Sequence, residues 1–126
     1  PEDSGTISLA VGRSAKGGKM AAHHEPEEGD RDAVTHYRVI ERMSKATYVS
    51  ARTETGRTHQ LRVHFNAIGC PVAGDPLYGG KLHRIASPRM FLHSTRLAFR
   101  HPATGKKMEF TSPLPEELQT VLDAVK

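Results

Sequence analysis

One ten-residue run, Thr55–His64, constrains the fold of this chain more than any other part of its 126 residues. Gly56 favours a turn near the start of the run, and the apolar residues after it recur with the period of a helix. That apolar stripe consists of Leu61, Phe65 and Ile68. Thr58 is predicted to cap the N-terminus of the helix, and Gly69 to end it. The stripe can then face a core while Arg62, on the opposite face, points into a cleft.

Alternating and β-branched segments predict strands in the rest of the chain. They lie at residues 5–11, 20–23, 34–43, 46–53, 91–99 and 107–111. Near the C-terminus a second helix is predicted, with Pro115 as its first residue and an apolar face made by Leu114, Leu118, Val121 and Leu122. We therefore expect an α+β fold, an antiparallel or mixed sheet of hairpins packed with two helices. The chain forms part of one domain, 1–126, and residues 13–33 form an exposed, loop-rich connection.

Composition narrows the class of protein. The formal net charge is +4 and the apolar share is 37%, which suits a small core and a polyanionic partner such as nucleic acid. Cys70 is the single cysteine, so an internal disulfide is impossible and a cysteine-based metal site is not expected. No apolar run reaches the length of a membrane span, and the first residues do not form a signal peptide. We expect a soluble cytoplasmic protein that makes no use of a membrane.

The histidines do not predict a metal site. His59 and His64 are five residues apart, so they do not share a helix face, and no suitably spaced ligand completes a set. The adjacent His23 and His24 are no better candidates. We expect His64 to be a histidine at the edge of the core, hydrogen-bonded to the backbone.

Two arginines and an aspartate predict a functional cleft. Arg57 and Arg62 flank the predicted helix start, and Asp75 lies in a later loop rich in glycine and proline. Such a loop can return a carboxylate to an arginine, because arginine–carboxylate pairing is planar and bidentate. Plain surface charge is the alternative reading of each arginine.

These residues resemble the RluA-type family of pseudouridine synthases. The similarity begins with Thr55–His64 and continues through Gly69–Gly80. Further similar segments are Gly5–Ile7 with Val11–Arg13, Ala33–Val39, Leu92–His93, His101–Gly105 and Ser112–Pro115. They follow the order and spacing of the family and cover nearly the whole chain.

The resemblance implies an isomerase that converts uridine in structured rRNA or tRNA to pseudouridine without a cofactor or a metal. The glycosidic bond breaks, the base turns over, and a carbon–carbon bond forms, after the uridine has left its stack. The residue matching Arg62 pairs with a catalytic aspartate, and the residue matching Leu92 packs near the base, although a register shift would place Phe91 there. We expect Arg57, His59, Arg96 and Arg100 to contact RNA. The sequence shows no exposed row of aromatic residues for stacking on bases.

Two parts of the family pattern are missing, the motif of the catalytic aspartate and the Lys-x-Tyr element that carries the family's active-site tyrosine. The family's catalytic aspartate lies in a His-Arg-Leu-Asp motif, which does not occur in these 126 residues. We therefore expect this chain to be the C-terminal half of a synthase domain, inactive alone, whose partner is the missing N-terminal half. The alternative is a catalytically silent RNA-binding module with the synthase fold. A small hydrolase that uses Asp75 and a histidine is a third possibility.

Overall fold

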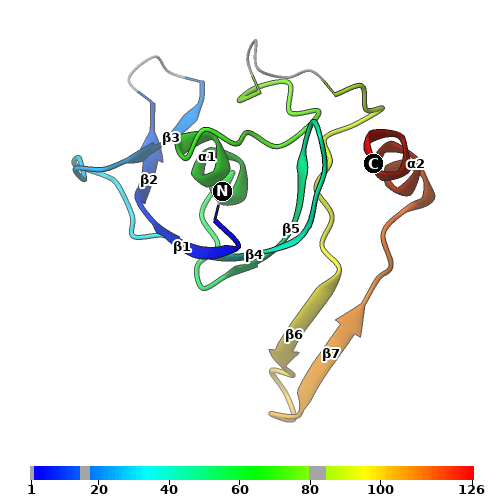
Figure 1. Ribbon diagram of the computed structural model, residues 1–126. Coiled ribbons are helices and arrows are strands. Elements are labelled where there is room, and N and C mark those ends of the chain that lie inside the picture. Colours follow the sequence, from blue (N-terminus) through cyan, green and yellow to red (C-terminus); the bar gives the residue numbers. More distant parts are fainter. Residues whose placement is uncertain (1, 15–17, 80–84) are drawn as a thin grey trace.

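The computed structural model describes residues 2–14, 18–79 and 85–126 (Figure 1). Gly80, the last residue of the predicted loop motif, lies outside these ranges. The strands are β1 (Ser4–Ser8), β2 (Ala10–Arg13), β3 (Met20–His23), β4 (Val34–Arg42), β5 (Thr47–Thr53), β6 (Arg96–Arg100) and β7 (Lys107–Thr111), and the helices are α1 (Gln60–Ala67) and α2 (Glu116–Val125). The predicted α+β class, with antiparallel hairpins and two helices, is confirmed.

Three strands form a curved antiparallel sheet in the order β1-β4-β5, and α1 lies on its concave side (Figure 1). The predicted β4–β5 hairpin is confirmed, with Tyr37 opposite Ala51. Its register shifts between Val39 and Glu41, so Ile40 occupies a bulge and is left 53% exposed. This bulge gives the chain an exposed apolar side chain at the far end of the sheet.

The single strand predicted at residues 5–11 is wrong, because the chain changes partner at Leu9. β1 pairs with β4, whereas β2 pairs with β3 in a separate two-stranded sheet. The carbonyl of Leu9, between the two strands, instead accepts a hydrogen bond of 2.9 Å from Nε2 of His64. Alternation of side chains cannot reveal such a switch, because both strands carry buried apolar residues, Ile7 in β1 and Val11 in β2.

Helix α1 begins one residue later than predicted and ends as predicted. Its N-cap is His59, with φ 55°, so the prediction of Thr58 as the cap is wrong. At the other end Gly69 has φ 78°, its N–H donates to the Asn66 carbonyl, and the Cys70 N–H donates to that of Phe65. This pair of bonds is the Schellman arrangement, which favours glycine because of the left-handed backbone.

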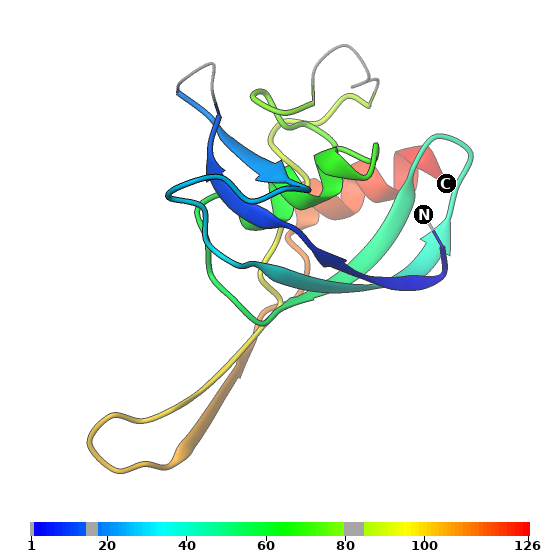
Figure 2. The same cartoon turned by 90° about the vertical axis from the view of Figure 1, so that its left-hand side faces the viewer.

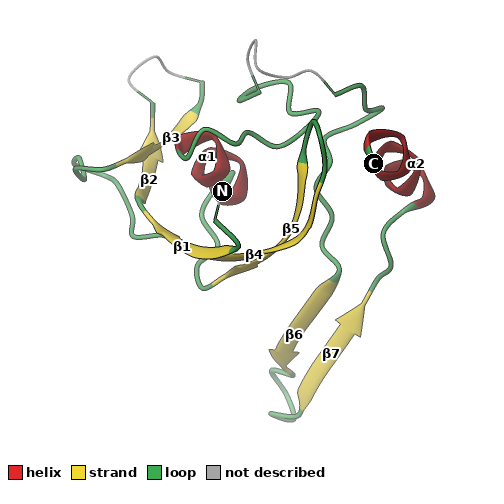
Figure 3. Ribbon diagram, in the orientation of Figure 1, coloured by secondary structure: helices red, strands yellow, loops and turns green. Residues whose placement is uncertain are grey.

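The main apolar cluster lies between α1 and the strands. It consists of the buried residues Val11, Ala33, Val63 and Tyr78, with Met20, Ala22 and Leu77 packed against them. Helix α2 buries Leu118, Val121 and Leu122, which confirms its predicted apolar face, but Pro115 is its N-cap and not its first residue. Figure 3 shows α1 and α2 on opposite sides of the β4–β5 hairpin. Within the described ranges, neither helix is long and apolar enough to cross a membrane.

The strand predicted at 91–99 is shorter than expected, because β6 begins only at Arg96. The N–H group of Phe91 donates to the Ala73 carbonyl, and that of Leu92 donates to the Met90 carbonyl. Phe91 and Leu92 are therefore bonded to loop residues and not to a neighbouring strand. From Arg96 the chain runs out in the β6–β7 hairpin, which projects away from the rest of the molecule in both views (Figures 1 and 2).

Candidate functional site

Arg62 and Asp75 form a buried, bidentate ion pair. Nε and Nη2 of Arg62 donate to the two carboxylate oxygens of Asp75, each at 2.9 Å. The Asp75 side chain is 0% exposed and that of Arg62 is 15% exposed. The expectation that the glycine-rich loop returns a carboxylate to an arginine is therefore confirmed. Arg62 is presented from α1, and Asp75 from the loop that follows it.

The backbone of that loop fixes Asp75. Oδ1 of Asp75 also accepts the N–H groups of Leu77 at 2.9 Å and Tyr78 at 3.1 Å, so the chain folds around its own carboxylate. Gly74 precedes it with φ 78°, and a Cβ there would lie 2.6 Å from the carbonyl oxygen of Arg89. Only glycine fits both the backbone conformation and this close approach.

The ion pair is held in its charged form. Burial by itself raises the pKa of Asp75, but the Arg62 guanidinium and the N–H groups of Tyr78 and Leu77 outweigh it and lower the pKa to about 2. The hydrogen bonds that Arg62 donates to Asp75 raise the pKa of Arg62. A carboxylate that accepts four hydrogen bonds and stays ionised is a poor general base, which argues against the hydrolase alternative.

Tyr78 joins this pair to the neighbouring elements. The Arg62 guanidinium carbon lies 5.0 Å from the centre of the Tyr78 ring, within the range of a cation–π contact. The Tyr78 hydroxyl accepts the N–H of Met20 in β3 at 3.0 Å and contacts Nδ1 of His59 at 2.8 Å. Arg62, Asp75, Tyr78 and His59 thus form one cluster, called the arginine cluster below.

A second, largely buried network of hydrogen bonds lies at the start of α1. Nε2 of His64 donates to the Leu9 carbonyl, and Nδ1 lies 2.8 Å from the Thr35 hydroxyl, which can donate to it when the imidazole is neutral. Burial lowers the pKa of His64 accordingly. Gln60 donates to the Thr35 hydroxyl at 3.0 Å and accepts from the Thr55 hydroxyl at 2.6 Å. The prediction of His64 as a backbone-bonded core histidine is confirmed.

Two further predicted site residues, Arg57 and Leu92, lie outside the arginine cluster. Nε of Arg57 donates to the Asp32 carbonyl at 2.7 Å, at the turn before α1. Leu92 is half-buried beside Phe91, whose N–H is bonded to Ala73 in the Asp75 loop. The Phe91 ring packs edge-on against Tyr48, with the ring centres 6.0 Å apart. The Phe91 side chain therefore packs against β5, the strand that carries Tyr48.

Arg96 and Arg100 do not join the cluster. Both are exposed on the projecting β6–β7 hairpin, where Nε of Arg96 donates to Glu109 at 2.8 Å. Nη1 of Arg100 donates to the Gly105 carbonyl at 3.2 Å. Of the residues expected to contact RNA, Arg96 and Arg100 therefore lie on the projecting hairpin, apart from His59 at the start of α1 (Figure 1).

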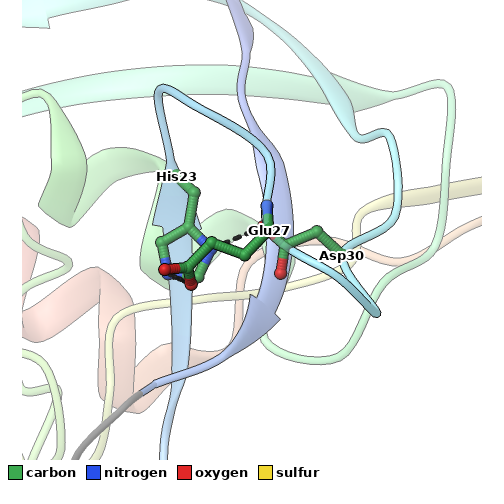
Figure 4. A group of neighbouring side chains, drawn as sticks. All are labelled: His23, Glu27 and Asp30. Carbon is green, nitrogen blue, oxygen red and sulfur yellow. Dashed lines mark hydrogen bonds and ion pairs between the residues drawn. The ribbon is translucent and has the colours of Figure 1, made fainter.

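His23, Glu27 and Asp30 form the group most like a set of metal ligands in the described ranges (Figure 4). Asp30 contacts Nδ1 of His23 at 2.6 Å, and Glu27 approaches Nε2 at 3.4 Å. One ligand atom from each of the three residues lies within 4.8 Å of the other two, and the two carboxylates contact opposite nitrogens of the one ring. The bonds to Glu27 N–H and to His23 lower the pKa of Asp30. These contacts link His23, at the end of β3, to Glu27 and Asp30 in the loop that follows it.

Sequence reasoning missed Tyr78 and the Gln60–Thr35 contacts. Tyr78 is the only aromatic residue between Cys70 and Pro88, three positions after Asp75, and this isolation was the one available signal. Gln60 and Thr35 are polar residues on opposite elements, and no periodicity indicates that they are buried together.

Comparisons with known proteins match the chain to one protein family. The sequence model of the family described as RNA pseudouridylate synthase matches residues 1–67. A ribosomal large subunit pseudouridine synthase D of Pseudomonas aeruginosa is 41% identical over 135 residues, covering 97% of this chain and 41% of that protein. An uncharacterized RNA pseudouridine synthase of Chloroflexus aurantiacus is 39% identical over 122 residues, covering 97% and 38%. The chain therefore spans about two fifths of the length of these relatives.

Two solved structures share the fold. Human RNA pseudouridylate synthase domain containing 1 superposes with a TM-score of 0.72 at 31% identity, covering 98% of this chain and 60% of that one. Human RNA pseudouridylate synthase domain containing 4 gives 0.66 at 22% identity, covering 98% and 56%, and supports the fold alone.

Proposed function

Because this chain belongs to the RNA pseudouridylate synthase family, we propose that it supplies the arginine side of an active site that converts uridine in RNA to pseudouridine. The observation that carries the proposal is the buried Arg62–Asp75 pair, which lies within the segments resembling the family's helix and loop. It holds a charged guanidinium in one orientation, which is what pairing with a catalytic carboxylate requires.

Arg62 has donors left for such a carboxylate. A guanidinium carries five N–H groups, and Asp75 accepts two of them through Nε and Nη2. We assign the rest to the catalytic aspartate, which the positive charge orients and keeps ionised. Asp75 is then a positioning residue, because it acts through Arg62 and does not touch the uridine.

The catalytic aspartate comes from a part of the synthase outside these 126 residues. No His-Arg-Leu-Asp motif occurs here, and Asp75 is already saturated by Arg62 and two backbone N–H groups. We therefore assign the catalytic half to a preceding segment of the same domain, and we expect the chain alone to be inactive. The substrate we propose is a structured rRNA or tRNA in the cytoplasm, with no cofactor in the reaction.

Around the site, we assign Leu92 to the packing of the target base and the basic side chains to the phosphates. Phe91 is held against Tyr48, which favours Leu92 as the residue free to meet the base. The proposed phosphate contacts are Arg57, His59, Arg96 and Arg100. Contacts of this kind position the RNA without reading its sequence.

The test is release of tritium from RNA labelled at C5 of uridine, because formation of the new carbon–carbon bond expels that hydrogen. A single-chain synthase containing these 126 residues should release tritium, and the 126 residues alone should not. Arg62→Ala in the active protein should lower kcat at least about 100-fold, because the catalytic aspartate loses its charged partner.

Arg38→Ala is the matched control, because Arg38 is exposed on β4 outside the arginine cluster. Its turnover should stay within about twofold of the parent. Near-normal turnover of a folded Arg62→Ala protein would remove Arg62 from the active site. Tritium release by the 126 residues alone would show that the catalytic group lies within this chain.

A further inference from the structure

The β6–β7 hairpin has two chemically different faces. Cross-strand pairing sets Leu97 opposite Phe110 and Phe99 opposite Met108, so these four side chains share one face. The other face carries Arg96, Ala98, Arg100, Lys107, Glu109 and Thr111. Every large apolar side chain falls on one face, and every charged side chain falls on the other together with Ala98 and Thr111. This division is typical of a ribbon that packs against an apolar partner.

The apolar face is largely open to solvent in this chain. Leu97 is 57% exposed, Phe99 43% and Phe110 51%, and the two phenylalanine rings stack with their centres 5.9 Å apart. The hairpin extends away from the body in both views (Figures 1 and 2). The two-stranded sheet also leaves one edge of each strand without a ladder partner within the described residues.

Such a ribbon is unfavourable in water by itself. A two-stranded hairpin is only marginally stable alone and needs a further strand or a packed layer. Contiguous exposed apolar side chains mark an interaction surface. The charges do not favour RNA as the occupant of this face, because the arginines and Lys107 point to the opposite side. The complementary partner is an apolar protein surface.

We infer that the apolar face of β6–β7 is the docking surface for the remainder of a synthase domain, which lays an apolar sheet surface or strand against it. This inference rests on the proposed function, in which another segment supplies the catalytic aspartate. The relatives provide the length for such a segment, because this chain spans only 41% of the Pseudomonas aeruginosa protein and 38% of the Chloroflexus aurantiacus protein. The hairpin then joins the two parts of the domain.

A chimera tests the inference. In the Pseudomonas aeruginosa synthase, the matched stretch is replaced by these 126 residues, and the double variant Phe99→Ser/Phe110→Ser is made in the chimera and in the 126-residue chain. Docking predicts that the double variant lowers the Tm of the chimera by about 5–15 °C, because it removes buried aromatic rings there. In the chain alone, where both rings are exposed, the Tm should change by less than about 2 °C.

Ile40→Ser is the matched control. Ile40 is an equally exposed apolar residue, at 53%, but it lies in the bulge of β4 and outside the hairpin. It should leave the Tm of both proteins within about 2 °C of their parents. Equal shifts of the two proteins by the double variant would overturn the inference. So would a chimera that fails to fold while its parent folds, because the ribbon would then not fit the partner.

Other occupants give other outcomes. A dimer of the 126-residue chain in analytical ultracentrifugation, abolished by the double variant, would assign the face to a second copy and overturn the inference. If the double variant lowered the RNA affinity of the chimera and left its Tm unchanged, the apolar face would be assigned to RNA. That result would also overturn the inference. Tritium release is measured separately, so a chimera that shows the Tm effect but no turnover would contradict the proposed function and leave the docking surface standing.

Discussion

At the scale of single residues, the Arg62–Asp75 pair shows how a loop fixes a charged side chain. Removing water from two ions is costly unless every donor and acceptor is used. Here Asp75 accepts four hydrogen bonds, two from Arg62 and two from the backbone of its own loop. The pair therefore ties α1 to the loop after it and fixes the guanidinium that we assign to catalysis.

Asp75→Asn should destabilise the chain by about 2–4 kcal/mol, because it leaves Arg62 buried without a counter-charge. The measurement is urea unfolding followed by circular dichroism at about pH 7. Asp3→Asn is the control, since Asp3 pairs with Arg42 but its side chain is 95% exposed. That change should cost less than about 0.5 kcal/mol. Equal effects of the two substitutions would contradict a special role for the buried pair.

The same pair predicts a pH dependence of stability. The pKa of Asp75 falls from 3.8 to about 2 on folding, so the folded state favours the ionised carboxylate. Its contribution, about 2 kcal/mol, is fully present above about pH 4 and is lost as the pH falls towards about 2. The difference in unfolding free energy between wild type and Asp75→Asn should narrow only in that window. Narrowing that begins near neutral pH would point to another titrating group.

At the scale of elements, two glycines with the same φ angle have different structural roles. Gly69 and Gly74 both have φ 78°. A Cβ at Gly69 would meet no atom within 4 Å, whereas one at Gly74 would lie 2.6 Å from the Arg89 carbonyl oxygen. Gly69 therefore serves only the end of α1. Gly74 also lets the Asp75 loop pack directly against the backbone that leads to β6.

Substitution by alanine separates these two roles. Gly69→Ala should cost about 1 kcal/mol, the price of a left-handed backbone at a residue with a Cβ. Gly74→Ala should cost about 2 kcal/mol more, because the Arg89 backbone must also move. Denaturant unfolding of the two variants measures the difference. If the two costs are equal, the close approach at Gly74 does not limit packing.

At the scale of the whole molecule, charge is distributed over regions that do not form one patch. The formal net charge is +4, and some basic groups are already paired, as Arg96 is with Glu109. The hairpin that carries Arg96 and Arg100 projects away from α1, the helix that carries Arg62 (Figure 1). RNA binding by this chain should therefore depend on separate phosphate contacts and little on sequence.

Fluorescence anisotropy with a structured RNA tests this expectation. Affinity should fall roughly tenfold or more as salt rises from about 50 to about 200 mM, because each phosphate contact releases counterions. Arg100→Ala should weaken binding and reduce the salt slope by about one. Glu109→Gln should strengthen binding, since it frees Arg96 from its partner. Tight binding that ignores salt would contradict this phosphate-contact account.

Local sequence determined most of the elements and one half of the candidate site. The helical stripe ending at Gly69, the β4–β5 hairpin and the apolar face of α2 all follow from periodicity and turn residues, which act over a few positions. The family resemblance identified Arg62, and the composition of the loop indicated that Asp75 could reach it. Errors fell at element ends, where His59 replaced Thr58 as the cap of α1 and Arg96 began β6.

Only the tertiary structure decided what these residues contact. The burial of His64 with Thr35 and Gln60, and the placement of Tyr78 beneath Arg62, bring together residues between 16 and 29 positions apart. The exposed Phe99–Phe110 pair is a further case, since the sequence predicts no exposed row of aromatic residues. Alternation predicts which side chains share a face of a strand, but not whether that face is covered. That depends on where the rest of the molecule packs.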